Sequence, residues 1–227
     1  MVELIGGLRA PTVAENLLRI RAELAGATAR SARRGASEPR VVEILAASKY
    51  IAAADLPVLA QAGVTLVGEN RAQDLQEKVA LHGDLFTWDF IGQLQSRRVR
   101  QIVPHVRLIH SVATESALRE LERHLAMARP GLGILIEVNI AGEPGKAGVA
   151  PAALDGFIAR SPVPVSGLMT MPPLARDPEE SRPWFAALRL LAHERGLAHL
   201  SMGTSQDYVV AAEEGATIVR IGTSLYR

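Results

Sequence analysis

A regular alternation of short apolar segments with longer amphipathic segments constrains the fold of this chain more than any other feature of its sequence. Eight segments have the β-branched and aliphatic pattern of buried strands, and each of the first seven precedes a segment with helical periodicity. Strands that alternate with helices pair in parallel, because the crossover helix returns the chain to the same edge of the sheet. Eight such units predict an α/β fold, a single closed (β/α)8 TIM barrel. The expected strands are residues 41–49, 64–70, 86–92, 108–112, 132–140, 163–171, 198–205 and 217–226.

The chain ahead of the first expected strand predicts one additional helix. Residues 11–34 open with Pro-Thr and carry apolar side chains at helical spacing, and residues 35–39 then break this pattern. An open, doubly wound sheet is the competing architecture, but no Gly-x-Gly-x-x-Gly follows the first strand, and glycines recur at strand ends instead. We therefore expect one domain over residues 1–227, with an N-terminal helix and linker in 1–40 and the barrel in 41–227.

Composition and charge restrict the classes of partner. Hydrophobic residues make up 48% of the chain and charged residues 22%, which is ordinary for a soluble globular protein. A formal net charge of +1 supplies no field that would steer the protein toward nucleic acid or a membrane. The absence of cysteine excludes disulfides and cysteine nucleophiles, and we recognise no leader segment and no stretch long enough to span a bilayer. We expect a cytoplasmic protein.

The carboxyl ends of the expected strands carry polar residues or glycine. Barrel enzymes place their chemistry at this end, so these side chains can be considered together. Taken singly, Ser111, Thr204 or Ser205 would be an ordinary helix cap. Together the strand ends predict a polar, partly glycine-lined mouth that contains one lysine. They are Lys49, Glu69, Asn70, Gly92, Gln93, His110, Ser111, Asn139, Thr170, Met171, Gly203, Thr204, Ser205 and residues 220–223.

Lys49 and the last two strand ends indicate a ligand. Lys49 ends an apolar strand, so its ammonium group would lose hydration, and its neutral amine could form a Schiff base with a carbonyl. A rim lysine that extends into water is the alternative interpretation. Ser205, Gly222 and Thr223 follow the seventh and eighth strands, where barrels often bind a phosphate. An aldehyde at Lys49 and a phosphate on the adjacent strands describe pyridoxal 5'-phosphate (PLP), with Arg220 placed to meet the pyridine nitrogen.

The same residues limit the chemistry of such a site. An arginine opposite the pyridine nitrogen would hold that nitrogen unprotonated and weaken PLP as an electron sink. No tyrosine can be assigned to the mouth facing Lys49, and the six histidines show no metal-ligand spacing. Glu137 should share the barrel-facing side of its strand with Asn139, and we expect an interior hydrogen bond to hold its carboxylate. These observations favour cofactor binding over catalysis.

An ordered series of short motifs resembles the pyridoxal phosphate homeostasis proteins, also called proline synthetase co-transcribed homologues. The fold of this family is similar to the N-terminal barrel of alanine racemase, which is PLP fold type III. Gly-Glu-Asn alone would be a weak signal, whereas the collinear series is specific. The matching segments are 46–49, 68–70, 88 with 90–95, 109–112, 138–139, 142–143, 146–148, 167–170, 200–203 with 205, and 219–223.

This resemblance implies a non-catalytic protein that handles PLP in vitamin B6 homeostasis. Lys49 would carry PLP as a covalent aldimine, and Arg220 would approach the ring nitrogen. Members of the family bind PLP and buffer or deliver it, so PLP-dependent apo-enzymes are the expected partners. The chain lacks the racemase's C-terminal β-domain, which supplies a second base across a dimer, so we expect a monomer. The other cofactor-binding residues implied by the resemblance are Asn70, Asn139, Met202, Ser205, Gly222 and Thr223.

Alternatives and departures from the family pattern leave some details open. A PLP-dependent amino-acid racemase is the main alternative, and a Schiff-base aldolase that uses Lys49 without a cofactor is a third interpretation. None of the departures lies at the proposed lysine, arginine or phosphate contacts; they concern the rim and any partner surface at residues 96–100. They are Asp89 in place of histidine, Arg97-Arg98 in place of Asn-Lys, Ala113 in place of aspartate and Glu137 in place of glutamine.

Overall fold

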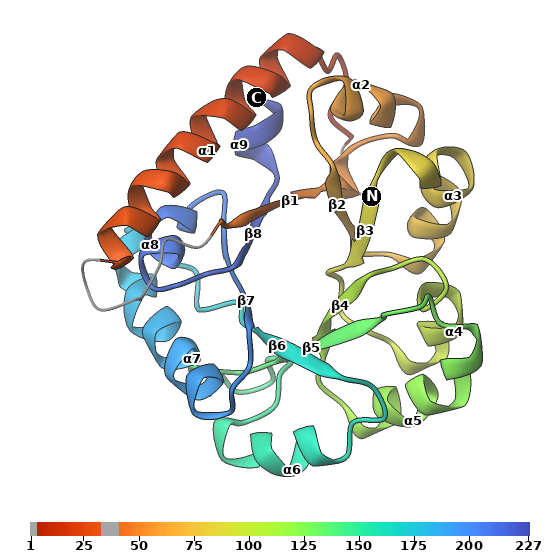
Figure 1. Ribbon diagram of the computed structural model, residues 1–227, viewed down its shortest axis with the longest axis vertical. Helices are drawn as coiled ribbons and strands as arrows, with labels where there is room; N and C mark the ends of the chain where they lie inside the picture. The colour runs from red at the N-terminus through yellow and green to blue at the C-terminus, as the bar shows by residue number, and fades with distance from the viewer. Residues whose placement is uncertain (1–3, 33–40) are drawn as a thin grey trace.

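Eight parallel strands close into a barrel in which strands that are sequential in the chain are also neighbours in space. The computed structural model describes residues 4–32 and 41–227. Strand β8 pairs with β1, which confirms the predicted closed barrel, and helices surround the strands (Figure 1). The strands are β1 (Glu43–Ala47), β2 (Leu66–Glu69), β3 (Thr87–Phe90), β4 (Leu108–Val112), β5 (Gly133–Glu137), β6 (Val165–Met169), β7 (His199–Thr204) and β8 (Ile218–Ile221).

The N-terminal helix α1 packs on the outside of the barrel against α8 and α9, beside β8 and β1 (Figure 1). It confirms the helix predicted over residues 11–34, although the last two residues of that range and the break at 35–39 lie outside the described residues. The α-helices are α1 (Ala10–Ala32), α2 (Leu56–Gln61), α3 (Ala72–His82), α4 (Val99–Ile102), α5 (Glu115–His124), α6 (Leu154–Ala159), α7 (Arg182–Glu194), α8 (Tyr208–Glu213) and α9 (Thr223–Tyr226).

Side chains along each strand alternate between two apolar layers, as the two-residue period of a strand requires. The outward side chains pack with the helices in one large cluster that includes Ala46, Val67 and Ile109. The inward side chains form a small second cluster, and Gly68 leaves room for it because a Cβ there would collide with Leu45. This inner cluster consists of Leu45, Leu66, Leu108 and Ile218.

Seven of the eight strands are shorter than the sequence predicts, and after β1 and β8 the chain turns directly at the mouth. β1 stops at Ala47, and Ser48–Tyr50 form a 3₁₀ turn in which Ile51 N donates to Ser48 O at 2.9 Å. The strand expected over residues 217–226 ends at Ile221 and continues as helix α9. The hydroxyl of Tyr226 on α9 donates to Ala47 O at 3.1 Å. Tertiary hydrogen bonds therefore satisfy backbone groups at the end of β1 and allow the chain to turn there.

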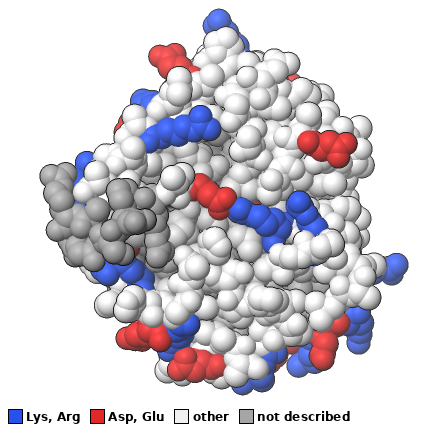
Figure 2. All heavy atoms as spheres, in the orientation of Figure 1, with Lys and Arg blue, Asp and Glu red and all other residues white. Residues whose placement is uncertain are grey.

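The surface carries charges of both signs without a large region of one sign on the visible face (Figure 2). This distribution matches the formal net charge of +1. Among the helices of the described residues, none is both long enough and apolar enough to cross a membrane.

Candidate functional site

Lys49 lies in the turn that follows β1, beside the ring of Tyr50. Its Nζ is 4.6 Å from the ring centroid, a distance at which an ammonium group is attracted to the aromatic face. Tyr50 is also close to β8, because a Cβ on Gly222 would lie 3.9 Å from Tyr50 Cε2. Lys49, Tyr50 and Gly222 thus share one corner of the mouth. Sequence reasoning assigned no tyrosine to this position, since a continuing strand would have pointed Tyr50 away from Lys49.

A buried ion pair supports this turn from below. Lys78 on α3 pairs with Glu69 at the end of β2, and their side chains are 6% and 0% exposed. Lys78 Nζ also donates to Ser48 O at 2.8 Å, and Ser48 Oγ donates to Glu69 Oε1 at 2.7 Å. We call Ser48, Glu69 and Lys78 the Lys49 support. Sequence reasoning missed Lys78, although its spacing from Leu75 places both on the buried face of α3.

Arg220 lies on β8 inside the barrel and is 7% exposed. Its Nη1 donates to Ser201 Oγ at 2.5 Å, and its Nη2 donates to Thr170 O at 3.0 Å. The same Nη2 lies 2.9 Å from Met171 Sδ. A guanidinium group has five donors and no acceptor, so Arg220 can present only N–H groups to a ligand.

Glu137 ends β5 and influences Arg220 without bonding to it. The expectation of an interior hydrogen bond is wrong for the described residues, none of which donates a hydrogen bond to its carboxylate. Burial raises the pKa of Glu137, and the positive charges of Arg220 and Lys146 partly oppose this rise. Burial likewise lowers the pKa of Arg220 to about 10, against the effect of Asp207 and Glu137. Arg220 is therefore still charged at neutral pH.

Ser205, Gly222 and Thr223 meet where β7 and β8 end. Ser205 Oγ accepts hydrogen bonds from Gly222 N at 3.1 Å and from Ser224 N at 3.4 Å. Two backbone N–H groups that converge on one oxygen are suited to a phosphate oxygen as well. A Cβ on Gly222 would lie 3.9 Å from Ala47 Cβ and from Tyr50 Cε2, so this glycine is next to the turn that carries Lys49. Thr223 is exposed at the start of α9.

The three residues expected around the ring have different surroundings. Asn70 Oδ1 is buried and has no hydrogen-bond partner among the described residues, so it can accept from a ligand donor. Both side-chain polar atoms of Asn139 form hydrogen bonds with the backbone of Glu143. Asn139 Nδ2 donates to Glu143 O at 2.9 Å, and Asn139 Oδ1 accepts from Glu143 N at 3.0 Å. Met202 is fully buried in the large outer apolar cluster. Contacts of Asn139 and Met202 with a ring stay predictions.

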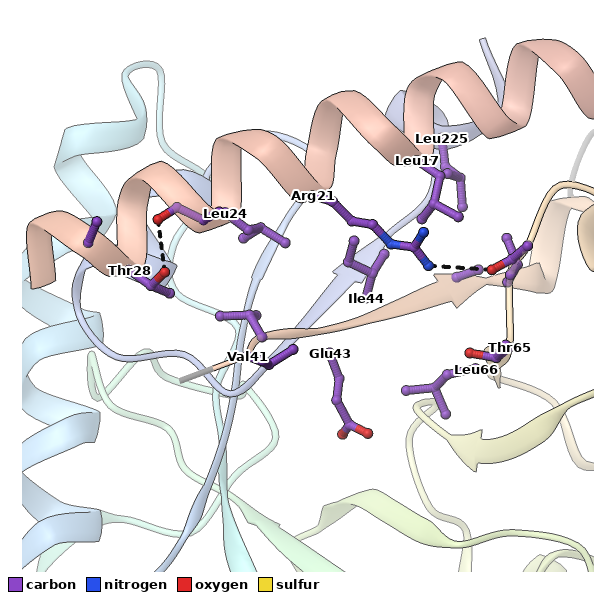
Figure 3. Close-up of a pocket in the computed structure, with 16 residues that line it drawn as sticks. Leu17, Arg21, Leu24, Thr28, Val41, Glu43, Ile44, Thr65, Leu66 and Leu225 are labelled. Atoms are coloured by element: carbon purple, nitrogen blue, oxygen red, sulfur yellow. Dashed lines mark hydrogen bonds between the residues drawn. The ribbon is translucent and has the colours of Figure 1, made fainter. Parts of the chain in front are cut away.

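A separate cavity lies at the opposite end of the barrel from Lys49. It has a volume of about 750 Å³ and lies between α1 and the first residues of β1 and β2 (Figure 3). Leu17, Leu24 and Ile44 contribute aliphatic walls, and Arg21 donates to Gly63 O at 3.5 Å. No lysine lines this cavity, so it does not compete with the mouth as a Schiff-base site.

Comparisons with known sequences identify similar proteins over almost the whole chain. The family model for the alanine racemase N-terminal domain matches residues 25–227. The pyridoxal phosphate homeostasis protein of Aquifex aeolicus is 40% identical over 195 residues, which cover 81% of this chain and 86% of that protein. The protein of the same name from Pseudomonas aeruginosa is 36% identical over 222 residues and 95% of each chain.

Solved structures with the same fold include PipY of Synechococcus elongatus with PLP bound. It is 32% identical with a TM-score of 0.77, over 95% of this chain and 100% of PipY. An unknown protein from Bifidobacterium adolescentis is 28% identical with a TM-score of 0.81, over 99% of this chain and 98% of that one. D-threonine aldolase from Filomicrobium marinum, at 15% identity and a TM-score of 0.70, covers 97% of this chain and 61% of the aldolase, and shares the fold alone.

Proposed function

The chain belongs to the pyridoxal phosphate homeostasis protein family, and on that premise we propose that it binds PLP covalently through Lys49 and buffers or delivers it without robust catalysis. One observation carries the proposal. Lys49, Arg220 and the donors that converge on Ser205 lie at the same end of the neighbouring strands β1, β8 and β7. PLP has an aldehyde, a ring nitrogen and a phosphate, which match these three groups in kind.

Lys49 is distinguished from the other lysines by its partners. The chain has three lysines, and within the described residues Lys78 and Lys146 form ion pairs with Glu69 and Glu143. The Nζ of Lys49 contacts the Tyr50 ring instead. Lys49 can therefore give up its charge to form a covalent bond without leaving a carboxylate unpaired. When bound, PLP supplies an aldehyde for such an amine and a ring that can accept electrons.

The remaining groups fit the other parts of PLP. Gly222 N, Ser224 N and the hydroxyls of Ser205 and Thr223 would bind the phosphate. The unpaired Oδ1 of Asn70 offers an acceptor near the ring. These roles are part of the proposal, as are those of Asn139 and Met202.

Arg220 supports a role in which the protein holds PLP and does not use it for catalysis. A ring nitrogen that accepts a hydrogen bond from a guanidinium group stays unprotonated, and an unprotonated ring stabilises carbanions poorly. Arg220 cannot supply a proton at neutral pH, because its pKa of about 10 keeps it charged and hydrogen-bonded to Ser201 and Thr170. We therefore expect weak amino-acid chemistry or none.

Borohydride reduction followed by peptide mass mapping tests the covalent site. The purified protein with PLP should show the absorption band of bound cofactor, and reduction should place one pyridoxyl group on the peptide that contains Lys49. Lys49→Ala should lose both the band and the label, whereas Lys146→Ala, the matched control, should keep both. A label on Lys78 or Lys146 would refute the assignment. Steady turnover of an amino acid that Lys49→Ala abolishes would instead identify a PLP enzyme such as a racemase.

A further inference from the structure

A chain of hydrogen-bonded side chains crosses the barrel interior from Arg220 to the opposite rim. It passes from β8 through β7, β4 and β3 and ends near the first residue of β1, where Figure 3 shows the Glu43 carboxylate pointing away from α1. Ser201, His110 and Asp89, the three central members, have exposures of 3% or less and we call them the Arg220 support. The members in order are Arg220, Ser201, His110, Asp89, Arg107 and Glu43.

The donors and acceptors in this chain agree with a neutral His110 that carries its proton on Nε2. Arg220 Nη1 must donate to Ser201 Oγ, because arginine has no acceptor. The Ser201 hydroxyl can then donate to His110 Nδ1 at 2.8 Å. His110 Nε2 keeps its proton and donates to Asp89 Oδ2 at 3.1 Å. Arg107 Nη2 also donates to this carboxylate, at 2.8 Å. Every link is satisfied when His110 is neutral and protonated on Nε2.

The charges around the chain favour the same state. Burial lowers the pKa of His110, the Asp89 carboxylate opposes this, and the positive charges of Arg220 and Arg107 lower it further. Burial raises the pKa of Asp89, but hydrogen bonds from His110 and Arg107 hold it below its ordinary value. A neutral His110 adds no second positive charge beside Arg220. The carboxylates that act on Arg220 from other elements are those of Asp207 and Glu137.

We propose that Asp89, His110 and Ser201 are positioning residues that hold the Arg220 guanidinium toward the ring nitrogen of PLP and so slow release of the cofactor. The inference rests on the proposed function. Asp89 sets the tautomer of His110, His110 orients the Ser201 hydroxyl, and Ser201 accepts from Nη1 of Arg220. Without Ser201, the hydrogen bonds of Arg220 within the described part of the chain would be those of Nη2 with Thr170 O and Met171 Sδ, so its planar group could turn about that edge.

The first experiment uses the protein without PLP and tests the series of hydrogen-bonded side chains itself. Long-range ¹H–¹⁵N spectra of the histidine side chains report which ring nitrogen of His110 carries the proton. We expect the Nε2–H form in the unmodified protein and its loss in Asp89→Asn, because an amide can donate to Nε2 and reverse the tautomer. An Nδ1–H or doubly protonated His110 in the unmodified protein near neutral pH would overturn the inference.

The second experiment uses the protein loaded with PLP that carries ¹⁵N in the ring. Ser201→Ala should speed PLP release about tenfold, the effect of losing one hydrogen bond to a charged group, and should shift the ring ¹⁵N resonance. Thr217→Ala is the matched control: its hydroxyl accepts from Leu200 N at 2.8 Å, and no hydrogen bond links it to Arg220. This control should leave both release and resonance unchanged.

The outcomes separate the inference from the proposed function. A release rate and ring resonance that are the same in Ser201→Ala as in the unmodified protein would overturn the positioning role while leaving covalent binding at Lys49 intact. A faster release in Ser201→Ala with an unchanged ring resonance would also overturn it, because a general loss of stability would explain that result. An unmodified protein that shows the Nε2–H tautomer but takes up no PLP on Lys49 would refute the proposed function instead.

Discussion

The Lys49 support and the Arg220 support hold two residues of one mouth in different ways. Ser48, Glu69 and Lys78 come from the turn after β1, from β2 and from α3, and they include a buried ion pair. Ser201, His110 and Asp89 come from β7, β4 and β3, and their chain continues to Arg107, whose side chain is 29% exposed. One support is local and closed, whereas the other spans the barrel and reaches water.

The two supports should therefore respond differently to the loss of one member. A buried ion pair that loses one partner leaves an uncompensated charge, which costs more than the pair itself contributed. A chain that includes a histidine and ends near solvent can adapt, since His110 can take up a proton and water can approach Arg107. Substitutions in the two supports would therefore differ in their effect on stability.

Lys78→Met should cause the largest loss of stability, about 3–5 kcal/mol in the free energy of unfolding, because Glu69 stays buried without its cation. Urea denaturation measures it. The double variant Lys78→Met with Glu69→Gln should recover much of the loss, since the unpaired charge is then gone. A loss in Lys78→Met no larger than that of a surface substitution would show that the ion pair does not dominate the Lys49 support.

Arg107→Met should cost about 2 kcal/mol, less than Lys78→Met. Asp89 would lose the hydrogen bonds of Arg107 but keep those of His110 Nε2 and of Leu108 N at 3.1 Å. The same urea titration compares the two variants directly. Equal losses in both would break the proposed contrast between a closed pair and an adaptable chain.

Stability of the protein without PLP should fall on the acid side. Because the pKa of His110 in the folded state lies below its ordinary value of 6.5, the unfolded chain binds the proton first. The stability that neutral His110 contributes is complete above about pH 6.5, and it is lost as the pH falls from there through the pKa of His110 in the folded state. His110→Gln should flatten this part of the curve. His105, whose pKa is also lowered by partial burial, should contribute to the same fall. Flattening by His105→Gln alone, with none by His110→Gln, would contradict the prediction.

Glu43→Gln should have the smallest effect, about 0.5 kcal/mol, because the pair with Arg107 lies at the rim and water screens it. The Glu43 side chain is 37% exposed, and Arg107 keeps both bonds to Asp89 in this variant. Thermal denaturation at low and high salt measures it, and salt should shrink the difference between variant and parent. A large, salt-independent loss of stability would mean that the series of hydrogen-bonded side chains depends on Glu43 at its outer end.

Prediction from the sequence succeeded where regular spacing carries the information. The alternation of segments predicted the barrel and its strand order, and parallel strands of a barrel all end at one rim, so the members of the mouth followed from the order along the chain. It placed Lys49, Arg220 and Ser205 at that rim, where the structure has them. Their roles toward PLP stay predictions.

Prediction failed where a contact depends on the exact path of the backbone or on long side chains. Among the described residues Glu137 has no interior hydrogen bond of the kind expected. Tyr50 reaches Lys49 because a 3₁₀ turn replaces the end of the strand. Asp89 stood out as a departure from the family pattern, but its partners could not be named. Arg107 is 18 residues from Asp89 and 64 from Glu43 in the sequence, and only barrel closure brings the three together.

The barrel and the kinds of side chain at its mouth could be predicted from the sequence, because burial periodicity sums a small preference over many residues, and the collinear motifs indicated the family. Which polar groups touch depended on the folded chain: the ion pair between β2 and α3 beneath Lys49, and the hydrogen-bonded side chains inside the barrel beneath Arg220. A hydrogen bond requires two atoms within a few tenths of an ångström and in the right direction, and strands distant in the chain meet that requirement only after the barrel has closed.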